Sequence, residues 1–300
     1  MARSSRRDFL KSSVAATVFS GLGSAIAITA GTVTKRSATD WVILGKSNVK
    51  VTRLAFGTGT YGGRVQRQLG QQEFTRMVRY AYDNGIRFFE TADSYHGMPQ
   101  MLAVALKGLP RDSYRLMTKY NTHDQEDPSA TIDRLRKDLD TEYVDIMLLH
   151  CVRSPEWPQK LARLEDQFSE AKSKKVILSH GASVHGLPAL RAFPGNQWLD
   201  IAMIRMNHNG TRMDTPSMED VDERGNVSEV VSHAKAVHAQ GMGVISMKLV
   251  GEGRFTSPED RQASLRFAMN TGAVDSVTLG YKNTSEIDEA IANLNRALNG

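Results

Sequence analysis

Short apolar runs alternate with longer amphipathic stretches along most of the chain. Eight of these runs are too short to form a free-standing helix and are rich in Val, Ile, Leu or Phe, so each is predicted to be a buried β-strand. The alternation of strand and helix predicts a parallel sheet that is covered by helices. The predicted strands occupy residues 54–57, 88–91, 115–119, 144–150, 176–179, 201–206, 243–247 and 274–280.

The stretches between the strands have the pattern of amphipathic helices. Apolar residues recur three and four positions apart in residues 74–82, and Asn84-Gly85 then supplies a stop signal. Residues that commonly cap helix N-termini precede four other stretches. These expected caps are Asp127, Asn226, Ser257 and Ser285.

Eight strand–helix units in about 270 residues favour closure into an α/β fold of the (β/α)8 TIM barrel type. The alternative is an open, doubly wound sheet, which would need a phosphate-binding fingerprint after an early strand. The glycines of residues 57–63 do not have that spacing and do not open directly onto a helix. Before the first barrel strand, residues 41–44 and 49–51 flank a turn at 45–48, which predicts an N-terminal β-hairpin over the bottom of the barrel.

The beginning of the chain has the pattern of an export signal. Residues 5–11 read Ser-Arg-Arg-Asp-Phe-Leu-Lys, which resembles the twin-arginine signal, and residues 12–34 carry no charge. Ala25-Ile26-Ala27 offers a cleavage site. We expect residues 1–30 to be a signal peptide for the twin-arginine (Tat) export machinery, residues 40–300 to be the barrel, and the protein to be periplasmic. An uncleaved signal would be its sole membrane contact, since this stretch can span a bilayer of ~30 Å.

The composition, with 40% hydrophobic and 24% charged residues, excludes a disordered, collagen-like or coiled-coil protein. The net charge of +5 arises largely in the leader, which holds four of the basic residues. The remainder has no basic block interleaved with aromatic residues, so nucleic acid is not an expected partner. Cys151 is the single cysteine, which excludes an intrachain disulfide and a zinc cage of several cysteines.

Polar side chains end three consecutive predicted strands. Glu90, Lys119 and His150 stand at the ends of the second, third and fourth strands, and Tyr95 lies in the loop after Glu90. The active site of a (β/α)8 barrel lies at the C-terminal ends of its strands. We therefore expect an acid, an amine, an imidazole and a phenol to meet at one site.

These residues stand in motifs that resemble the aldo-keto reductase family. The motifs are Phe-Phe-Glu-Thr-Ala-Asp-Ser-Tyr at 88–95, Lys119 after a strand, and Val-Asp-Ile-Met-Leu-Leu-His at 144–150. Residues 44–59 and 243–253 resemble the same family. The resemblance implies an oxidoreductase that transfers a hydride between NADP(H) and a small-molecule carbonyl or alcohol substrate.

The resemblance also implies a role for each polar side chain. Tyr95 would be the general acid, and Lys119 would lower its pKa. Glu90 would hold Lys119, and His150 would orient the carbonyl group. Glu90 stands where the family has an aspartate, so its extra methylene is expected to displace the carboxylate. Asp93 lies only two residues before Tyr95, so this role is not transferred to it.

The resemblance places a nucleotide site at further strand ends and loops. Val184, Met203 and Met247 depart from the asparagine, glutamine and aromatic residue that the family has there. Lys282 is the remaining cation for a 2′-phosphate, whereas Glu286 would repel one, so NADP(H) is expected and NAD(H) stays open. The residues expected to bind the nucleotide are Gly57, Thr58, Ser183, Met203, Met247, Lys248, Gly280, Lys282 and Asn283.

Two other interpretations stay open: an exported barrel of altered chemistry that retains its nucleotide tightly, and a barrel without catalysis that binds a ligand or partner. No metal is expected, because residues 54–60 hold no His-x-His pair and the spacing of His180 and His185 is not that of a helical metal pair. Cys151 follows His150 and is expected to point to the opposite face of its strand as a buried structural thiol.

Overall fold

The computed structural model describes residues 35–122, 127–217 and 223–300. Within these residues, eight parallel strands form a closed barrel in the order β10-β3-β4-β5-β6-β7-β8-β9. The pairing of β10 with β3 closes the sheet, so the predicted TIM barrel is confirmed and the open doubly wound sheet is wrong. The predicted leader lies outside the described residues. The barrel strands are β3 (Leu54–Gly57), β4 (Phe88–Glu90), β5 (Arg115–Asn121), β6 (Val144–Val152), β7 (Ile177–Val184), β8 (Ile201–Arg205), β9 (Gly243–Met247) and β10 (Ser276–Leu279).

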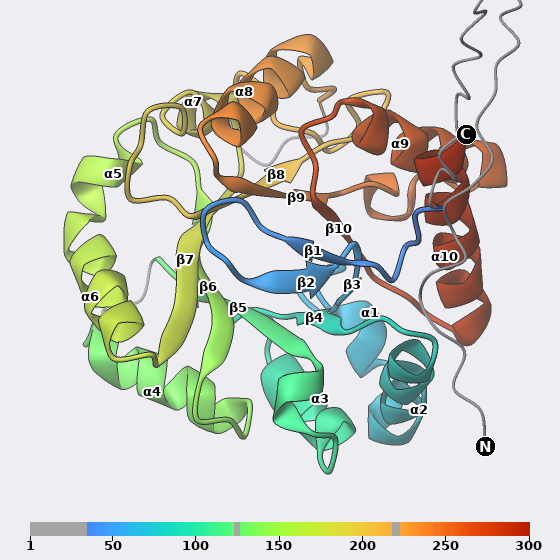
Figure 1. Ribbon diagram of the computed structural model, residues 1–300, viewed down its shortest axis with the longest axis horizontal. Coiled ribbons are helices and arrows are strands. Elements are labelled where there is room, and N and C mark those ends of the chain that lie inside the picture. Colours follow the sequence, from blue (N-terminus) through green and yellow to red (C-terminus); the bar gives the residue numbers. More distant parts are fainter. Residues whose placement is uncertain (1–34, 123–126, 218–222) are drawn as a thin grey trace, which may run out of the picture. The chain divides into compact units, whose positions relative to one another are not determined.

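Helices surround the barrel on its outer side (Figure 1). None of the described helices is long and apolar enough to cross a membrane. They are α1 (Arg64–Arg67), α2 (Gly70–Asp83), α3 (Met98–Leu106), α4 (Pro128–Asp138), α5 (Trp157–Lys160), α6 (Ala162–Ser173), α7 (Leu187–Leu190), α8 (Val227–Ala239), α9 (Pro258–Asn270) and α10 (Thr284–Asn299), with short 3-10 helices η1 (Arg111–Ser113) and η2 (Gly251–Gly253).

Most of the expected helix caps are confirmed. Asp127, Asn226 and Ser257 each accept a hydrogen bond from a backbone N–H of the following helix. Ser285 does not cap α10. Asn283 does so instead, because its extended backbone lets its side chain accept from the N–H of Glu286 at 3.0 Å.

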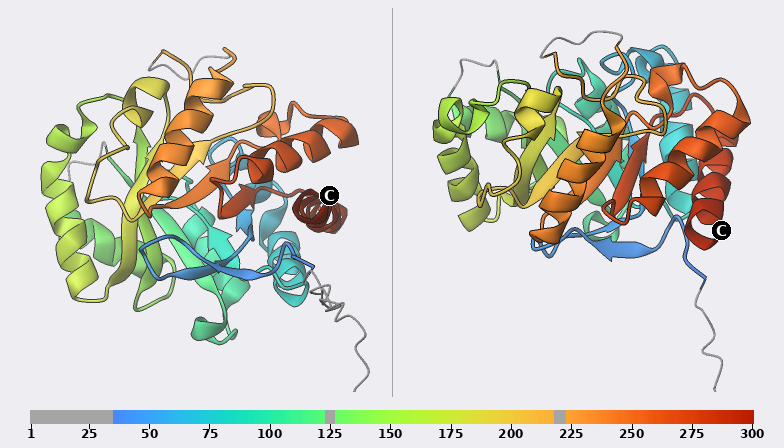
Figure 2. Two further views of the ribbon diagram at one scale, coloured as in Figure 1. Left: turned by 45° about the horizontal axis from the view of Figure 1, so that its top comes forward. Right: turned by 90° about the horizontal axis from the view of Figure 1, so that it is seen from above.

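A β-hairpin of β1 (Trp41–Ile43) and β2 (Lys50–Thr52) lies across one end of the barrel, as predicted (Figure 1; Figure 2). Three apolar side chains of the hairpin and its turn are buried in the same cluster as the side chains of the barrel interior. A Cβ atom at Gly45 in the turn would lie 2.2 Å from the carbonyl oxygen of Gly241, so this close approach requires glycine. The hairpin therefore plugs the N-terminal end of the barrel. Its buried side chains are Leu44, Val49 and Val51.

Alternate residues of each strand point into the barrel. The polar residues Glu90 on β4, Lys119 on β5 and His150 on β6 each lie two positions after an apolar residue that points into the barrel. The pleat of the sheet therefore aims three polar side chains into one space at the C-terminal end. The buried apolar layer below them includes Phe88, Met117, Ile146, Leu148, Ile201, Met203 and Ile245.

Strand β6 contains an irregularity next to His150. Its register with β7 shifts between Leu149 and Val152. Both of these residues pack into the outer apolar core although they are three positions apart, so one extra residue is inserted between them. Cys151 lies in this insertion with a φ of 57°, and its sulfur lies within 4.8 Å of a ring nitrogen of His150. The expectation that Cys151 points to the opposite face from His150 is therefore wrong, because the insertion interrupts the alternation, and the residue is only partly buried.

Candidate active site

Tyr95, Lys119 and Glu90 come together at the C-terminal end of the barrel. The ammonium group of Lys119 forms a buried ion pair with Oε1 of Glu90. The same ammonium group donates to the carbonyl oxygen of Thr91 at 3.0 Å and to the phenol oxygen of Tyr95 at 3.4 Å. Residues that the sequence placed at separate strand ends and in a loop are thus in direct contact.

The longer side chain of Glu90 finds room beside β3 and β10. Its second oxygen, Oε2, accepts a hydrogen bond from the hydroxyl of Thr278 at 3.4 Å. A Cβ atom at Gly57 would lie 2.9 Å from this oxygen and 2.6 Å from the hydroxyl of Thr278. Because residue 57 is glycine, the carboxylate fits beneath Lys119 and is held at both oxygens, despite the extra methylene.

His150 packs edge-to-face against Tyr95, with ring centroids 5.5 Å apart. Its Nδ1 is hydrogen-bonded to the hydroxyl of Ser94 at 3.0 Å, which leaves Nε2 for another partner. On the β3 side, a Cβ atom at Gly59 would lie 2.6 Å from the phenol oxygen of Tyr95. The position of the phenol is therefore fixed from two sides, by an imidazole and by a glycine loop.

Burial determines the protonation of Tyr95 and His150. Desolvation raises the pKa of Tyr95 well above its usual value of 10, and the charge of Glu90 adds to this rise. Desolvation lowers the pKa of His150 well below 6.5, and the charge of Lys119 adds to this fall. The phenol is therefore protonated and the imidazole neutral at neutral pH. The lowering of the Tyr95 pKa that is expected from Lys119 does not outweigh the desolvation and the charge of Glu90.

Asp93, the other carboxylate near Tyr95 in the sequence, is engaged elsewhere. Its two oxygens accept hydrogen bonds from the guanidinium group of Arg134 on α4, at 2.8 and 3.1 Å. This bidentate pair anchors the loop after β4 to the outer helices. The carboxylate that reaches Lys119 is the one five residues before Tyr95, not the one two residues before it.

Two adjoining cavities lead from Tyr95 along this end of the barrel. The smaller, of about 70 Å³, is lined by Tyr95 and Glu90. The larger, of about 550 Å³, extends to Glu286 and Asn293 on α10. The two cavities share the lining residues Thr60, Val250, Glu252, Leu279 and Gly280.

Most of the residues predicted to bind a nucleotide line these cavities. Gly57, Met203, Met247, Lys248 and Gly280 line the smaller one, and Lys282 lines the larger one. The other three predicted residues form hydrogen bonds within the protein. Thr58 donates its hydroxyl to the carbonyl oxygen of Glu90 at 3.0 Å, Ser183 accepts from the backbone N–H of Cys151 at 3.1 Å, and Asn283 caps α10.

Cations and carboxylates are paired at the α10 end of the larger cavity. Arg261 forms two hydrogen bonds with Glu289, at 2.6 and 3.0 Å. The ammonium group of Lys282 lies 3.5 Å from Glu286, and the backbone N–H of Lys282 donates to the same carboxylate at 2.8 Å. A phosphate group that enters here would lie near both positively and negatively charged side chains.

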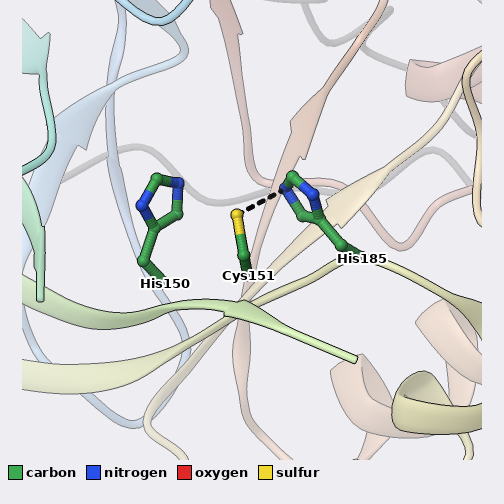
Figure 3. A group of neighbouring side chains, drawn as sticks. All are labelled: His150, Cys151 and His185. Atoms are coloured by element: carbon green, nitrogen blue, oxygen red, sulfur yellow. Dashed lines mark hydrogen bonds between the residues drawn. The ribbon is translucent and has the colours of Figure 1, made fainter. Parts of the chain in front are cut away.

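Arg205 and His185 also lie at this end of the barrel, although neither was among the predicted site residues and the sequence spacing of His185 spoke against a metal pair with His180. The guanidinium group of Arg205 contacts Nδ1 of His185, and Nε2 of His185 is hydrogen-bonded to the sulfur of Cys151 at 3.4 Å (Figure 3). Arg205 lies two positions beyond Met203, on the inward face of β8, and His185 directly follows β7. The signal that could have identified them is the one that identified Glu90: a polar residue at the C-terminal end of a predicted barrel strand.

The model of the aldo/keto reductase family matches residues 53–265, which is more than half of the chain. The chain belongs to the aldo-keto reductase family. The closed barrel is therefore the fold of an aldo-keto reductase.

Three relatives illustrate how far this aldo-keto reductase resembles known proteins. L-galactose dehydrogenase of Arabidopsis thaliana is 24% identical over 295 residues, which cover 83% of this chain and 86% of that protein. A Glycine max protein named "Probable aldo-keto reductase 1" is 30% identical over 155 residues, so the match spans 47% of this chain and 45% of that protein. An aldo-keto reductase from Klebsiella pneumoniae, solved in complex with NADPH, shares the fold with a TM-score of 0.64 at 16% identity, over 85% of this chain and 89% of that chain.

Proposed function

We propose that this aldo-keto reductase transfers a hydride between NADP(H) and a small carbonyl or alcohol substrate, with Tyr95 as the group that gives or takes the proton. The observation that carries the proposal is the contact of Lys119 with both Glu90 and Tyr95, beside a cavity at the C-terminal end of the barrel. The NADPH in the Klebsiella pneumoniae relative supports the choice of cofactor.

The residues around the cavities fit a nicotinamide nucleotide. The larger cavity, at about 550 Å³, has the size of a typical small-molecule site. Met203 and Met247 form an apolar, polarisable wall next to Tyr95, which suits a planar ring. Arg261 and Lys282 offer cations to phosphate groups at the α10 end. When bound, the nicotinamide supplies or accepts the hydride.

Tyr95 and His150 act on the substrate oxygen. The protonated phenol donates its proton to this oxygen as negative charge develops there. When the hydroxyl of Ser94 donates its hydrogen bond to Nδ1 of His150, the neutral ring carries its proton on Nε2, which donates a second hydrogen bond to the same oxygen. Lys119, held by Glu90, stabilises the phenolate that remains. In the reverse direction, this phenolate takes the proton of the alcohol.

Replacing Tyr95 with phenylalanine removes the proton donor and keeps the ring that packs against His150. We expect kcat/KM for carbonyl reduction to fall by about 10²–10⁴-fold. The affinity for NADPH, measured from the quenching of protein fluorescence, should change little. Tyr80→Phe on the outer helix α2 is the matched control and should keep the wild-type rate. An unchanged rate in Tyr95→Phe would remove Tyr95 from the mechanism.

The pKa directions of Tyr95 and His150 predict a wide pH range for carbonyl reduction. The pKa of Tyr95 is raised above 10, so the phenol keeps its proton as the pH rises toward that value. The pKa of His150 is lowered below 6.5, so the ring becomes protonated and charged only at more acidic pH. We expect kcat/KM for reduction to stay level between about pH 6.5 and 10. A decrease centred between pH 7 and 9 in steady-state rates would contradict these protonation states.

Glu286 is expected to weaken binding of a 2′-phosphate, since its carboxylate lies beside Lys282 at the α10 end of the cavity. Glu286→Gln keeps an acceptor for the backbone of Lys282 and removes the negative charge. We expect the KM for NADPH to fall several-fold, while the KM for NADH stays within error. Glu229→Gln, on α8 away from these cavities, is the control. Equal effects on both nucleotides would show that Glu286 does not contact the 2′-phosphate.

We also propose that residues 1–30 direct the folded protein to the periplasm by the twin-arginine route, on the strength of the Ser-Arg-Arg-Asp-Phe-Leu-Lys sequence at residues 5–11. Export of a folded chain would let the nucleotide cross with the protein. Replacing Arg6 and Arg7 together with lysine keeps the charge and removes the arginine pair. We expect this variant to remain in the cytoplasm in fractionated cells. Undiminished export would overturn the assignment.

A further inference from the structure

A second cluster of reactive side chains lies next to the proposed catalytic group. His150, Cys151 and His185 each present one potential metal ligand, and these atoms all lie within 4.8 Å of one another. The sulfur of Cys151 stands between the two imidazole rings (Figure 3). The sulfur is 3.4 Å from Nε2 of His185, and Nε2 of His150 is the ring nitrogen that does not bond to Ser94.

The backbone of β6 and β7 creates this cluster. The insertion in β6 gives Cys151 a left-handed conformation, with φ at 57°, and turns its side chain to the same side as His150. The N–H of Cys151 donates to Ser183 at 3.1 Å, and the N–H of His185 donates to the carbonyl oxygen of Val152 at 2.9 Å. Both strand ends are thereby fixed to each other, with the sulfur held between the two rings.

Two imidazoles and one thiol form a ligand set that suits Zn²⁺. Zinc binds sulfur at ~2.3 Å and imidazole nitrogen at ~2.0–2.1 Å, so neighbouring ligand atoms of a tetrahedral site lie ~3.3–3.6 Å apart. The distance from the sulfur of Cys151 to Nε2 of His185 already has this value. A rotation of the His150 side chain that moves its ring nitrogen by about 1 Å would complete a set of three protein ligands. The fourth position of the metal would stay open.

We propose that His150, Cys151 and His185 form a binding site for Zn²⁺, and that its occupation inhibits the reductase. The thiol of Cys151 gives up its proton to solvent when its sulfur coordinates the metal, and no oxidation or reduction takes place. The inhibition rests on the proposed function, because it follows from the loss of Nε2 of His150 as a donor to the substrate oxygen. The metal site itself does not depend on that function.

Arg205 competes with the metal for His185. A neutral imidazole that binds a metal through Nε2 carries its proton on Nδ1. The guanidinium group of Arg205 now faces Nδ1, so two donors would meet there, and Arg205 must move away when Zn²⁺ binds. Its positive charge opposes the metal as well. Arg205 therefore sets the affinity of the site, and the occupied and empty forms differ in the position of this side chain.

Binding is tested with Co²⁺ as a spectroscopic substitute for zinc, on the full chain without an affinity tag. We expect about one Co²⁺ per chain, with a thiolate-to-cobalt charge-transfer band and the visible bands of a four-coordinate ion, and we expect Zn²⁺ to abolish both. Cys151→Ser should lose the charge-transfer band, and His185→Gln should weaken binding by at least ~10-fold. His238→Gln on α8 is the matched control and should bind like the wild type.

Three outcomes would overturn the proposal. One is the absence of the charge-transfer band from the wild-type protein. Another is equal binding by wild type, Cys151→Ser and His185→Gln, which would mean that the metal binds adventitiously at other surface groups. The third is equal or weaker binding by Arg205→Met, which should instead bind Zn²⁺ more tightly because the competing donor and its charge are gone. Circular dichroism of each variant excludes a loss of folding as the cause.

Inhibition is measured separately, as the ratio of carbonyl reduction with and without Zn²⁺ in each protein. The ratio should fall with increasing Zn²⁺ in the wild type, and should stay near one in Cys151→Ser over the same concentrations. If the protein reduces no carbonyl compound at all, the cobalt spectrum still tests the metal site. If the spectrum shows no site while reduction proceeds, the metal proposal fails and the reductase proposal stands.

Discussion

The ion pair between Lys119 and Glu90 is the interaction on which the C-terminal end of the barrel depends. Both side chains are almost fully buried, with 1% and 4% of their surface exposed. Removal of one partner would leave an unpaired charge in the interior, which typically costs about 3–5 kcal/mol. The contacts with Thr91 and Thr278 satisfy further hydrogen-bonding capacity of the pair. The ion pair keeps a charged ammonium group beside the phenol of Tyr95, although burial by itself disfavours a charged group there.

The same pair changes the chemistry of its neighbours. Burial raises the pKa of Tyr95 well above its usual value, and the negative charge of Glu90 adds to the rise, so the phenol stays protonated. In the proposed mechanism, a protonated phenol is the form that donates a proton to a substrate oxygen. Glu90 in place of an aspartate still reaches Lys119, despite its extra methylene. Gly57 makes that contact possible by leaving room for the longer side chain.

The insertion in β6 lies between the residues of the two proposed sites. Up to Leu149 the strand alternates regularly and delivers His150 to the interior, next to Tyr95. Beyond it, the left-handed residue Cys151 brings a sulfur to the same side and next to His185. His150, the proposed donor to a substrate oxygen, is therefore also one of the three residues of the proposed metal site. This overlap is why occupation of the second cluster would affect the first.

The sequence by itself determined the barrel, the hairpin and the meeting of Glu90, Lys119, Tyr95 and His150. Hydrophobic periodicity reports which residues share a face, and parallel strands bring their C-terminal ends to one edge. The side to which Cys151 turns, and the capping of α10 by Asn283 rather than by Ser285, were decided by local backbone conformation, which periodicity does not encode. The raised pKa of Tyr95 and the contacts of His185 were decided by the tertiary structure alone. They depend on burial and on distances between different strands, and these exist only once the barrel has closed.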